Sequence, residues 1–243
     1  MSHVLEPLLP KVATRNNRRV RKGYSKSKIA LLIALILLLT ATTMNFIEQV
    51  SKRRDQPRMF QIVVYGDSIT ENGSNRNGFV EILNQRNIRR ADIVNRGFSG
   101  YKTNDLLDYI VPITQHLAAD LSFLLIGTND ARTYSDQCCT VEEYINNIFI
   151  LIDKFQLHTK DLVLVTPPPT SDTQAHDNEH TKQYRDAIIL IGNKTRLTVI
   201  DSWQFMDFGD LNDGVHFNDN GNRKMADAYQ TVIDSYHLPH FLP

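Results

Sequence analysis

An apolar strand followed at once by a glycine, an acid and a hydroxyl residue constrains this chain more than any other feature. Residues 60–65 are rich in β-branched side chains and indicate a buried strand, which Gly66 ends. Asp67 and Ser68 follow directly, so Ser68 is predicted at the carboxyl end of the strand. In open α/β sheets, ligands and reactive groups collect at this edge. Ser68 is therefore a candidate nucleophile, with the alternative that it only caps the next helix.

A matching base lies near the other end of the chain. Asp213 and His216 are three residues apart, so the carboxylate can accept from one imidazole nitrogen while the other faces a serine. Such pairs also cap helices, but Asn218 or Asp219 is the better cap for the helix that follows. The spacing therefore indicates an acid–base pair suited to a Ser-His-Asp triad.

Two further polar blocks follow predicted strands. Gly100 comes shortly after the apolar residues 93–94, and Asn129 comes shortly after residues 121–126. Both are predicted at the same sheet edge as Ser68. A backbone N–H at Gly100 and the side-chain amide of Asn129 would supply the donors that an acyl-transfer enzyme aims at the developing oxyanion. Each block alone is typical of a plain turn, but together, in this order, they favour a hydrolase.

Four sequence blocks resemble the SGNH family of serine hydrolases, also called GDSL esterases and lipases. They are G-D-S-I-T at residues 66–70, N-R-G-F-S-G-Y at 95–101, G-T-N-D at 127–130 and D-G-V-H at 213–216. The likeness covers about residues 60–236 and looks closest to the isoamyl acetate-hydrolysing esterase group, which residues 166–169 and 200–203 also resemble. The resemblance implies a flavodoxin-like strand order. It also implies Ser68 as nucleophile, Gly100 and Asn129 as oxyanion donors with the Ser68 N–H, His216 as base and Asp213 as its partner.

Predicted strands alternate with predicted helices along the chain. Besides residues 60–65, strands are expected at 93–94, 121–126, 162–165 and 197–200. Helices are expected at 78–85, from a cap at Thr103 through Ile110, at 140–155 behind a capping box, at 177–191, and from Asn218 or Asp219 to about 236. This alternation predicts an α/β fold with a parallel five-stranded sheet between two helical layers.

The N-terminal part carries an uncharged apolar segment. No residue between Lys28 and Glu48 is charged, and residues 29–47 are long enough, at ~1.5 Å each, to approach the ~30 Å hydrocarbon layer. This segment predicts a retained transmembrane signal-anchor, with a signal peptide cleaved near Thr42 as the alternative. The expected organisation is a basic cytosolic segment (1–28), the transmembrane helix (29–47), a tether (48–58) and an SGNH hydrolase domain (59–243).

Charge is distributed unevenly along a chain that is neutral as a whole. Residues 1–28 hold eight Lys and Arg against one Glu, whereas residues 59–243 hold fifteen basic and twenty-four acidic residues. The basic start should stay in the cytosol, which predicts a single-pass membrane protein with its domain on the non-cytosolic side. A secreted form after cleavage and a mitochondrial presequence are the alternatives. The acidic domain argues against a nucleic-acid groove.

Histidine and cysteine spacing favours neither a metal site nor a disulfide framework. His176 and His180 lie four apart, but no third ligand accompanies them, so both are expected to be solvent-exposed. Cys138 and Cys139 are the only cysteines and are adjacent, which allows only a strained disulfide.

These patterns together predict a membrane-tethered serine esterase for short-chain carboxylic esters, without metal or organic cofactor. Its small ester or acylated substrate is expected to contact Asp67, Phe98, Tyr101, Tyr134 and Trp203. Three alternatives remain: a lysophospholipase or thioesterase-type lipid hydrolase, an anchored binding domain without catalysis, and a flavodoxin-like nucleotide or flavin binder. The last two would leave the Asp-His pair without a use.

Overall fold

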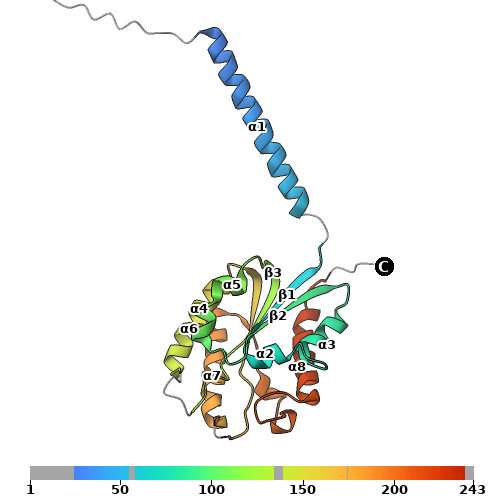
Figure 1. Ribbon diagram of the computed structural model, residues 1–243, viewed down its shortest axis with the longest axis vertical. Coiled ribbons are helices and arrows are strands. Elements are labelled where there is room, and N and C mark those ends of the chain that lie inside the picture. Colours follow the sequence, from blue (N-terminus) through green and yellow to red (C-terminus); the bar gives the residue numbers. More distant parts are fainter. Residues whose placement is uncertain (1–24, 55–57, 134–138, 174, 239–243) are drawn as a thin grey trace, which may run out of the picture. The chain divides into compact units, whose positions relative to one another are not determined.

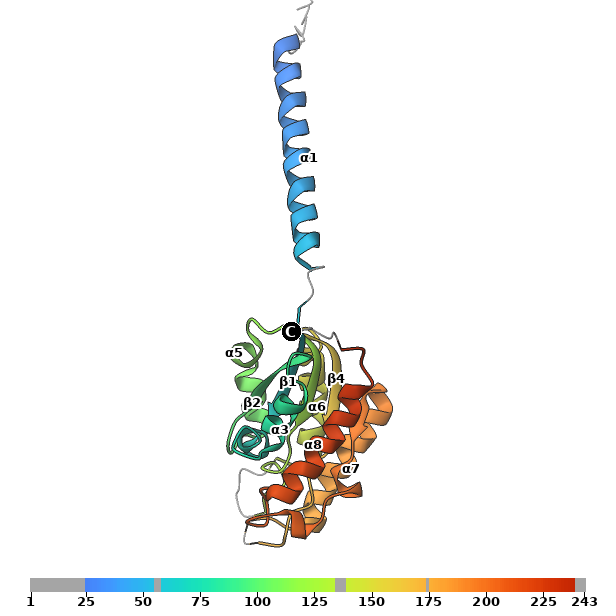
Figure 2. The same cartoon turned by 90° about the vertical axis from the view of Figure 1, so that its right-hand side faces the viewer.

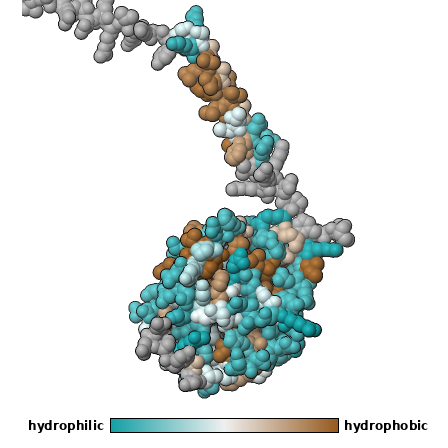
Figure 3. Space-filling model, in the orientation of Figure 1, coloured by the Kyte–Doolittle hydropathy of each residue, from teal (hydrophilic) through white to brown (hydrophobic). Residues whose placement is uncertain are grey.

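The computed structural model describes residues 25–54, 58–133, 139–173 and 175–238. The chain divides into two units, Met1–Gln56 and Pro57–Pro243. The described residues of the first unit form the helix α1 (Lys26–Arg54), in which Lys26–Gln49 is long and apolar enough to cross a membrane. Its large apolar side chains are exposed, and they form the brown band along this helix in Figure 3. The predicted apolar N-terminal helix is thus present.

A parallel five-stranded sheet forms the centre of the second unit. Its strands are β1 (Phe60–Gly66), β2 (Ala91–Gly97), β3 (Ala119–Leu125), β4 (Thr159–Val165) and β5 (Thr198–Ile200), in the order β2-β1-β3-β4-β5. This is the predicted flavodoxin-like order. Gly66 pairs with Gly97 on one side and with Leu125 on the other, so the ends of β1, β2 and β3 lie together at the carboxyl edge.

Helices cover both faces of this sheet (Figures 1 and 2). They are α2 (Ser68–Asn72), α3 (Phe79–Arg86), α4 (Thr103–Asp108), α5 (Ile110–Thr114), α6 (Val141–Phe155), α7 (Asn178–Thr195) and α8 (Asp219–Asp234), with 3₁₀ turns η1 (Ser202–Gln204) and η2 (Phe208–Asp210). Ile62 and Val64 of β1 pack with α3 and α8, whereas Val63 and Tyr65 pack with α4, α6 and α7. This alternation, with a period of two, produces the predicted three layers.

Helix starts show where local sequence rules hold and where they fail. Thr140 and Glu143 form the predicted capping box of α6, with the Thr140 N–H donating to Glu143 Oε2 at 2.8 Å. Thr103 was expected to cap a helix through Ile110. It is instead the first residue of α4, and Lys102 occupies the N-cap position. Its hydroxyl donates to Asp130 Oδ1 at 2.6 Å, and the helix stops at Asp108. The expected cap is wrong because a buried acid takes the hydroxyl.

Candidate active site

Ser68 begins α2 directly after β1. The N-cap of α2 is Asp67, whose Oδ1 accepts from the Ile69 N–H at 3.0 Å, so Ser68 is not the cap. A side chain at Gly66 would bring its Cβ within 2.2 Å of the Leu125 carbonyl oxygen, so only glycine fits this passage from strand to helix. The turn leaves Ser68 half-buried at the carboxyl edge of the sheet, as predicted.

A continuous hydrogen-bonded chain joins Ser68, His216 and Asp213. Ser68 Oγ lies 2.9 Å from His216 Nε2, and His216 Nδ1 lies 2.7 Å from Asp213 Oδ2. Asp213 Oδ1 also accepts from the backbone N–H groups of His216 and Val215, at 2.8 and 3.0 Å. Burial would raise the pKa of Asp213, but these hydrogen bonds outweigh it and lower the pKa to about 2. The structure therefore brings Ser68 together with Asp213 and His216, although Ser68 and His216 are 148 positions apart in the sequence.

The loop that carries Asp213 and His216 is braced from a neighbouring loop. Gly214 adopts a left-handed conformation with φ +87°, and its carbonyl accepts from the Ser171 N–H at 2.8 Å. A Cβ on Gly214 would be strained at this φ and would lie 3.1 Å from the Thr173 methyl group. The loop thus holds the imidazole by backbone contacts on both sides, because the Asn212 N–H also donates to the His216 carbonyl at 2.7 Å.

The two predicted oxyanion donors lie in loops after β2 and β3. Gly100 has φ +79°, is exposed, and has open space where a Cβ would stand. Asn129 is buried, and its Nδ2 donates to the Tyr101 carbonyl at 2.9 Å. A side-chain amide carries two N–H donors, so this bond fixes the Asn129 amide and leaves its second donor for another acceptor. The role of both residues stays a prediction.

A buried acid, Asp67, stands behind the nucleophile. It has no exposed surface, and its Oδ2 has no hydrogen-bond partner among the described residues. Burial raises the pKa of Asp67 to about 7 against the hydrogen bond from Ile69, and the nearby Asp130 carboxylate adds to the rise. This burial corrects the expectation that Asp67 contacts substrate. Its contact with Ile69 instead ties down the turn that carries Ser68.

Asp67→Asn should make the stability of the folded state less sensitive to pH. The pKa of Asp67 is about 7 when folded and 3.8 as the ordinary value, so the folded chain keeps a proton that the unfolded chain releases. The free energy of unfolding therefore falls as pH rises through this window, by at most about 1.4 kcal/mol per pH unit from this group. Asparagine still caps α2 but does not titrate. Urea unfolding at a series of pH values should show that the free energy of unfolding of the variant rises relative to that of wild type between about pH 5 and 7.

The matched control for this measurement is Asp92→Asn, which alters an exposed acid on β2. Its unfolding free energy should follow that of wild type at every pH. A curve for Asp67→Asn that also runs parallel to wild type would contradict the buried, protonated state of Asp67.

Aromatic side chains line a hollow beside the Gly100 loop. Phe98 and Tyr101 stack with ring centroids 5.0 Å apart, and Tyr109 packs on Tyr101 at 5.9 Å. With Pro112 and Ile113 they line a cavity of about 350 Å³. The Phe98 N–H donates to the Gly66 carbonyl at 3.0 Å, so one residue that lines the cavity is bonded to the end of β1, just before Ser68. Tyr109 was missed by the sequence because it follows α4, where only tertiary packing brings it to Tyr101.

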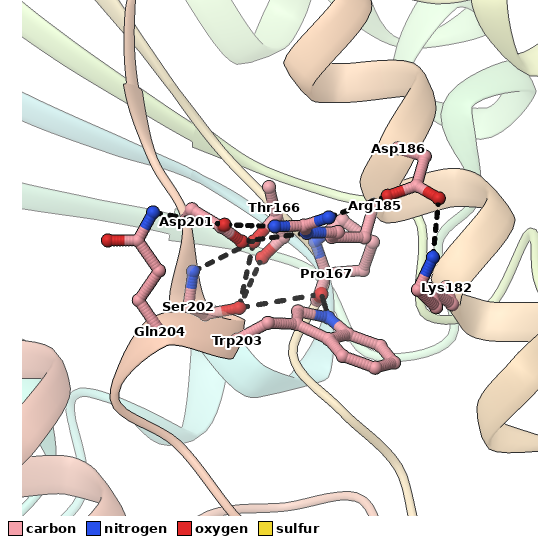
Figure 4. A network of polar contacts seen from close by, with 9 residues as sticks. All are labelled: Thr166, Pro167, Lys182, Arg185, Asp186, Asp201, Ser202, Trp203 and Gln204. Atoms are coloured by element: carbon pink, nitrogen blue, oxygen red, sulfur yellow. Dashed lines mark hydrogen bonds and ion pairs between the residues drawn. The ribbon is translucent and has the colours of Figure 1, made fainter.

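The structure describes one of the other two predicted substrate contacts, Trp203, whose role stays a prediction. Trp203 belongs to η1, and its Nε1 donates to the Pro167 carbonyl at 2.9 Å (Figure 4). It adjoins a polar network in which Arg185 holds Asp201 by two hydrogen bonds, one of them at 3.0 Å from Arg185 Nε. This network ties α7 to the end of β5. Tyr134 falls outside the residues that the structure describes.

His176 is buried rather than solvent-exposed, which corrects the sequence expectation. Burial lowers its pKa to about 4, and the positive charge of Arg132 adds to the effect. It precedes Asp177, the N-cap of α7, so it does not share a helical face with His180. Across the described ranges no three His, Cys, Asp or Glu residues gather as metal ligands. Cys139 is a free, buried thiol.

Comparison with known proteins places this geometry in a family. The model of the GDSL-like lipase/acylhydrolase family matches residues 64–224, which contain Ser68 and the 213–216 block. A GDSL esterase/lipase of Arabidopsis thaliana is 27% identical over 205 residues, covering 71% of this chain and 85% of the relative. The human isoamyl acetate-hydrolysing esterase 1 homolog is 26% identical over 213 residues, covering 75% of this chain and 86% of the relative.

Solved structures share the fold of the second unit. An acetyl xylan esterase, AlAXEase, superposes with a TM-score of 0.65 at 20% identity, covering 72% of this chain and 100% of that one. A lipase/acylhydrolase from Enterococcus faecalis gives a TM-score of 0.65 at 22% identity, covering 76% of this chain and 100% of that one. These likenesses show the fold, and the family match over residues 64–224 establishes that the chain belongs to the GDSL-like lipase/acylhydrolase family of carboxylic ester hydrolases.

Proposed function

We propose that this protein is a serine esterase that works through an acyl-enzyme on Ser68. The observation that carries the proposal is the chain of hydrogen bonds from Ser68 Oγ through the His216 imidazole to Asp213, at 2.9 and 2.7 Å. In this proposal His216 Nε2 takes the proton of Ser68 as its oxygen attacks the ester carbonyl. Asp213 accepts from Nδ1–H, which fixes the tautomer and stabilises the imidazolium that forms.

The oxyanion of the tetrahedral intermediate is held, in this proposal, by three N–H donors. Two are the backbone N–H groups of Ser68 and Gly100, and the third is the free N–H of the Asn129 amide. Each such donor is worth ~3 kcal/mol of transition-state stabilisation, or ~10² to 10³ in rate. His216 then protonates the departing alkoxide, the alcohol leaves, and water activated by the same imidazole releases the acid from Ser68.

The acyl group is proposed to enter the aromatic cavity beside Phe98. The cavity measures about 350 Å³, and its lining consists of the aromatic and apolar residues Phe98, Tyr101, Tyr109, Pro112 and Ile113 together with Asn95, Arg96 and Gly97. Burying each CH₂ contributes ~0.8 kcal/mol, so affinity should grow with chain length only until the cavity is full.

A series of p-nitrophenyl esters should therefore show kcat/KM highest from acetyl to hexanoyl and falling beyond. The full-length protein in detergent, assayed from acetyl to dodecanoyl under identical conditions, provides the measurement. A profile that rises steadily through dodecanoyl would refute the short-acyl proposal. It would favour the second candidate, a lysophospholipase-type lipid hydrolase, which the apolar α1 makes plausible because a membrane anchor brings lipid substrates within reach.

We also propose that α1 is a retained signal-anchor rather than a cleaved signal. The uncharged stretch in Lys26–Gln49 is preceded by a strongly basic segment, and the positive-inside tendency then places the esterase domain on the non-cytosolic side. This proposal concerns the membrane and the compartment only, and the hydrolytic mechanism does not depend on it.

The protein in its native membranes should stay in the pellet after washing with alkaline carbonate, because a spanning helix is not released by high pH. N-terminal sequencing of that material should find a start at Met1 or Ser2. Release into the supernatant of a chain that begins near Thr42 would instead identify a cleaved signal peptide.

A further inference from the structure

A wide polar depression adjoins the catalytic imidazole. It measures about 910 Å³ and is bounded by the turn after α2, the loop that carries Asp213 and His216, and the first turns of α8. His216 itself lines it. We call it the polar basin. It is separate from the aromatic cavity, since His216 lines only the basin and Phe98 and Tyr101 line only the aromatic cavity.

The wall of the polar basin is made of amide groups and of charged groups, with equal numbers of positive and negative charges. Arg76 and Arg223 carry two positive charges, and Asp213 and Asp219 carry two negative ones. Neither guanidinium has a carboxylate partner within the part of the chain that the structure describes. The remaining wall is mostly asparagine, and its apolar members are few, namely Gly78 and Phe217; the asparagines are Asn72, Asn75, Asn212, Asn218, Asn220 and Asn222.

Several of these side chains are already held in place. Asn222 Oδ1 accepts from the Phe79 N–H at 3.0 Å while its Nδ2 donates to the Asn218 carbonyl at 3.0 Å. Asn220 Nδ2 donates to Asp210 Oδ1 at 2.6 Å. Asn220 and Asn222 are therefore fixed, while Arg76 and Arg223, which also line the basin, keep free donors. A fixed polar wall costs little to organise around a ligand.

The proposed mechanism indicates which half of the ester, the acyl group or the alcohol, would lie in this basin. Under the proposed function, on which this inference rests, His216 Nε2 must protonate the oxygen of the departing alcohol. The alcohol half of the ester must therefore extend on the side of the imidazole, and the polar basin is the cavity that His216 lines. An apolar alcohol there would gain no hydrogen bonds from these amide and guanidinium groups, whereas the hydroxyl groups of a polar alcohol would.

We infer that the polar basin is the subsite for the leaving alcohol and that it takes a neutral polyhydroxylated alcohol of the sugar or glycerol class. Vicinal hydroxyl groups both donate and accept, which matches a wall of amides, two guanidinium groups and two carboxylates. The formal charges of the wall cancel, so the basin does not favour an anionic alcohol. The natural ester then combines a short acyl group with a hydroxyl-rich alcohol.

Substrates that share one acyl group and differ only in the alcohol test this inference. Glycerol monoacetate and an acetylated monosaccharide carry the hydroxyl groups, isoamyl acetate carries none, and acetylated glycerol phosphate carries an added negative charge. With the full-length protein, kcat/KM for the two neutral polyol esters should exceed that for isoamyl acetate at least tenfold. Arg76→Ala and Arg223→Ala should each lower this ratio several-fold, mainly by raising KM for the polyol esters.

Lys154→Ala provides the matched control, because Lys154 is an exposed cation on α6, far from the basin in the fold. This variant should keep both the wild-type activity and the wild-type ratio. A ratio that is unchanged in both arginine variants would overturn the location of the subsite.

Two other outcomes would overturn the inference while leaving the esterase proposal intact. One is hydrolysis of p-nitrophenyl acetate together with a preference for isoamyl acetate over the polyol esters. The other is a preference for the acetylated glycerol phosphate over its neutral counterpart, which would mean that the arginines select an anion. If no ester were hydrolysed and p-nitrophenyl acetate were also left intact, the proposed function itself would fail.

Discussion

Ser68→Ala should reduce kcat/KM on p-nitrophenyl acetate to the background rate. Loss of a nucleophilic serine in a triad costs on the order of 10⁶ in rate, because the remaining groups cannot form the acyl-enzyme. The fold should survive, since Ser68 is half-buried and the cap that starts α2 comes from Asp67 and not from the serine. The measurement is steady-state hydrolysis beside a thermal unfolding curve that matches that of wild type.

Ser99→Ala is the matched control, because it removes an exposed hydroxyl from the loop beside Gly100. Its turnover should stay within a few-fold of wild type. If Ser68→Ala retained more than a trace of turnover while Ser99→Ala lost it, the nucleophile would have been assigned to the wrong serine.

Asp213→Asn should lower kcat by ~10⁴, the cost of losing this carboxylate in the Ser-His-Asp template. The asparagine Oδ1 can still accept from the N–H groups of Val215 and His216, so the loop should keep its shape. What changes is the partner of His216 Nδ1, now 2.7 Å from Asp213 Oδ2. An amide N–H at that point favours the tautomer that cannot take the serine proton.

Single-turnover kinetics of Asp213→Asn should show the loss in the acylation step. Asp153→Asn, an exposed acid on α6, serves as the control and should retain wild-type kinetics. Activity of Asp213→Asn within a few-fold of wild type would remove Asp213 from the mechanism but would leave Ser68 and His216 in place.

The strands and helices could be predicted well, because the sequence patterns that mark them are local. A run of β-branched residues ended by Gly66 marked β1, the apolar residues 121–126 before Gly127 marked β3, and the Thr140–Glu143 pair marked the start of α6. The strand order came from the family resemblance, since periodicity alone does not rank parallel strands. Ser68 was predicted from its place at a strand end, and Asp213 and His216 were predicted from their spacing of three residues. In the structure these three side chains are hydrogen-bonded.

Features that depend on burial could not be predicted from the sequence. Asp67 and His176 are polar residues, and nothing in the sequence around them indicates that the fold encloses both side chains. The polar basin is assembled from two segments far apart in the chain, residues 72–78 and 212–223, and its asparagines are indistinguishable from ordinary surface residues until the fold brings them together.

The most direct test of the account is covalent labelling of the full-length protein with a serine-reactive fluorophosphonate, followed by peptide mass mapping. The account predicts one phosphonyl adduct, on Ser68, with labelling abolished in Ser68→Ala and much slower in Asp213→Asn because the imidazole no longer activates the hydroxyl. A protein that turns over p-nitrophenyl acetate but carries the adduct on another residue, or on none, would contradict the catalytic assignment.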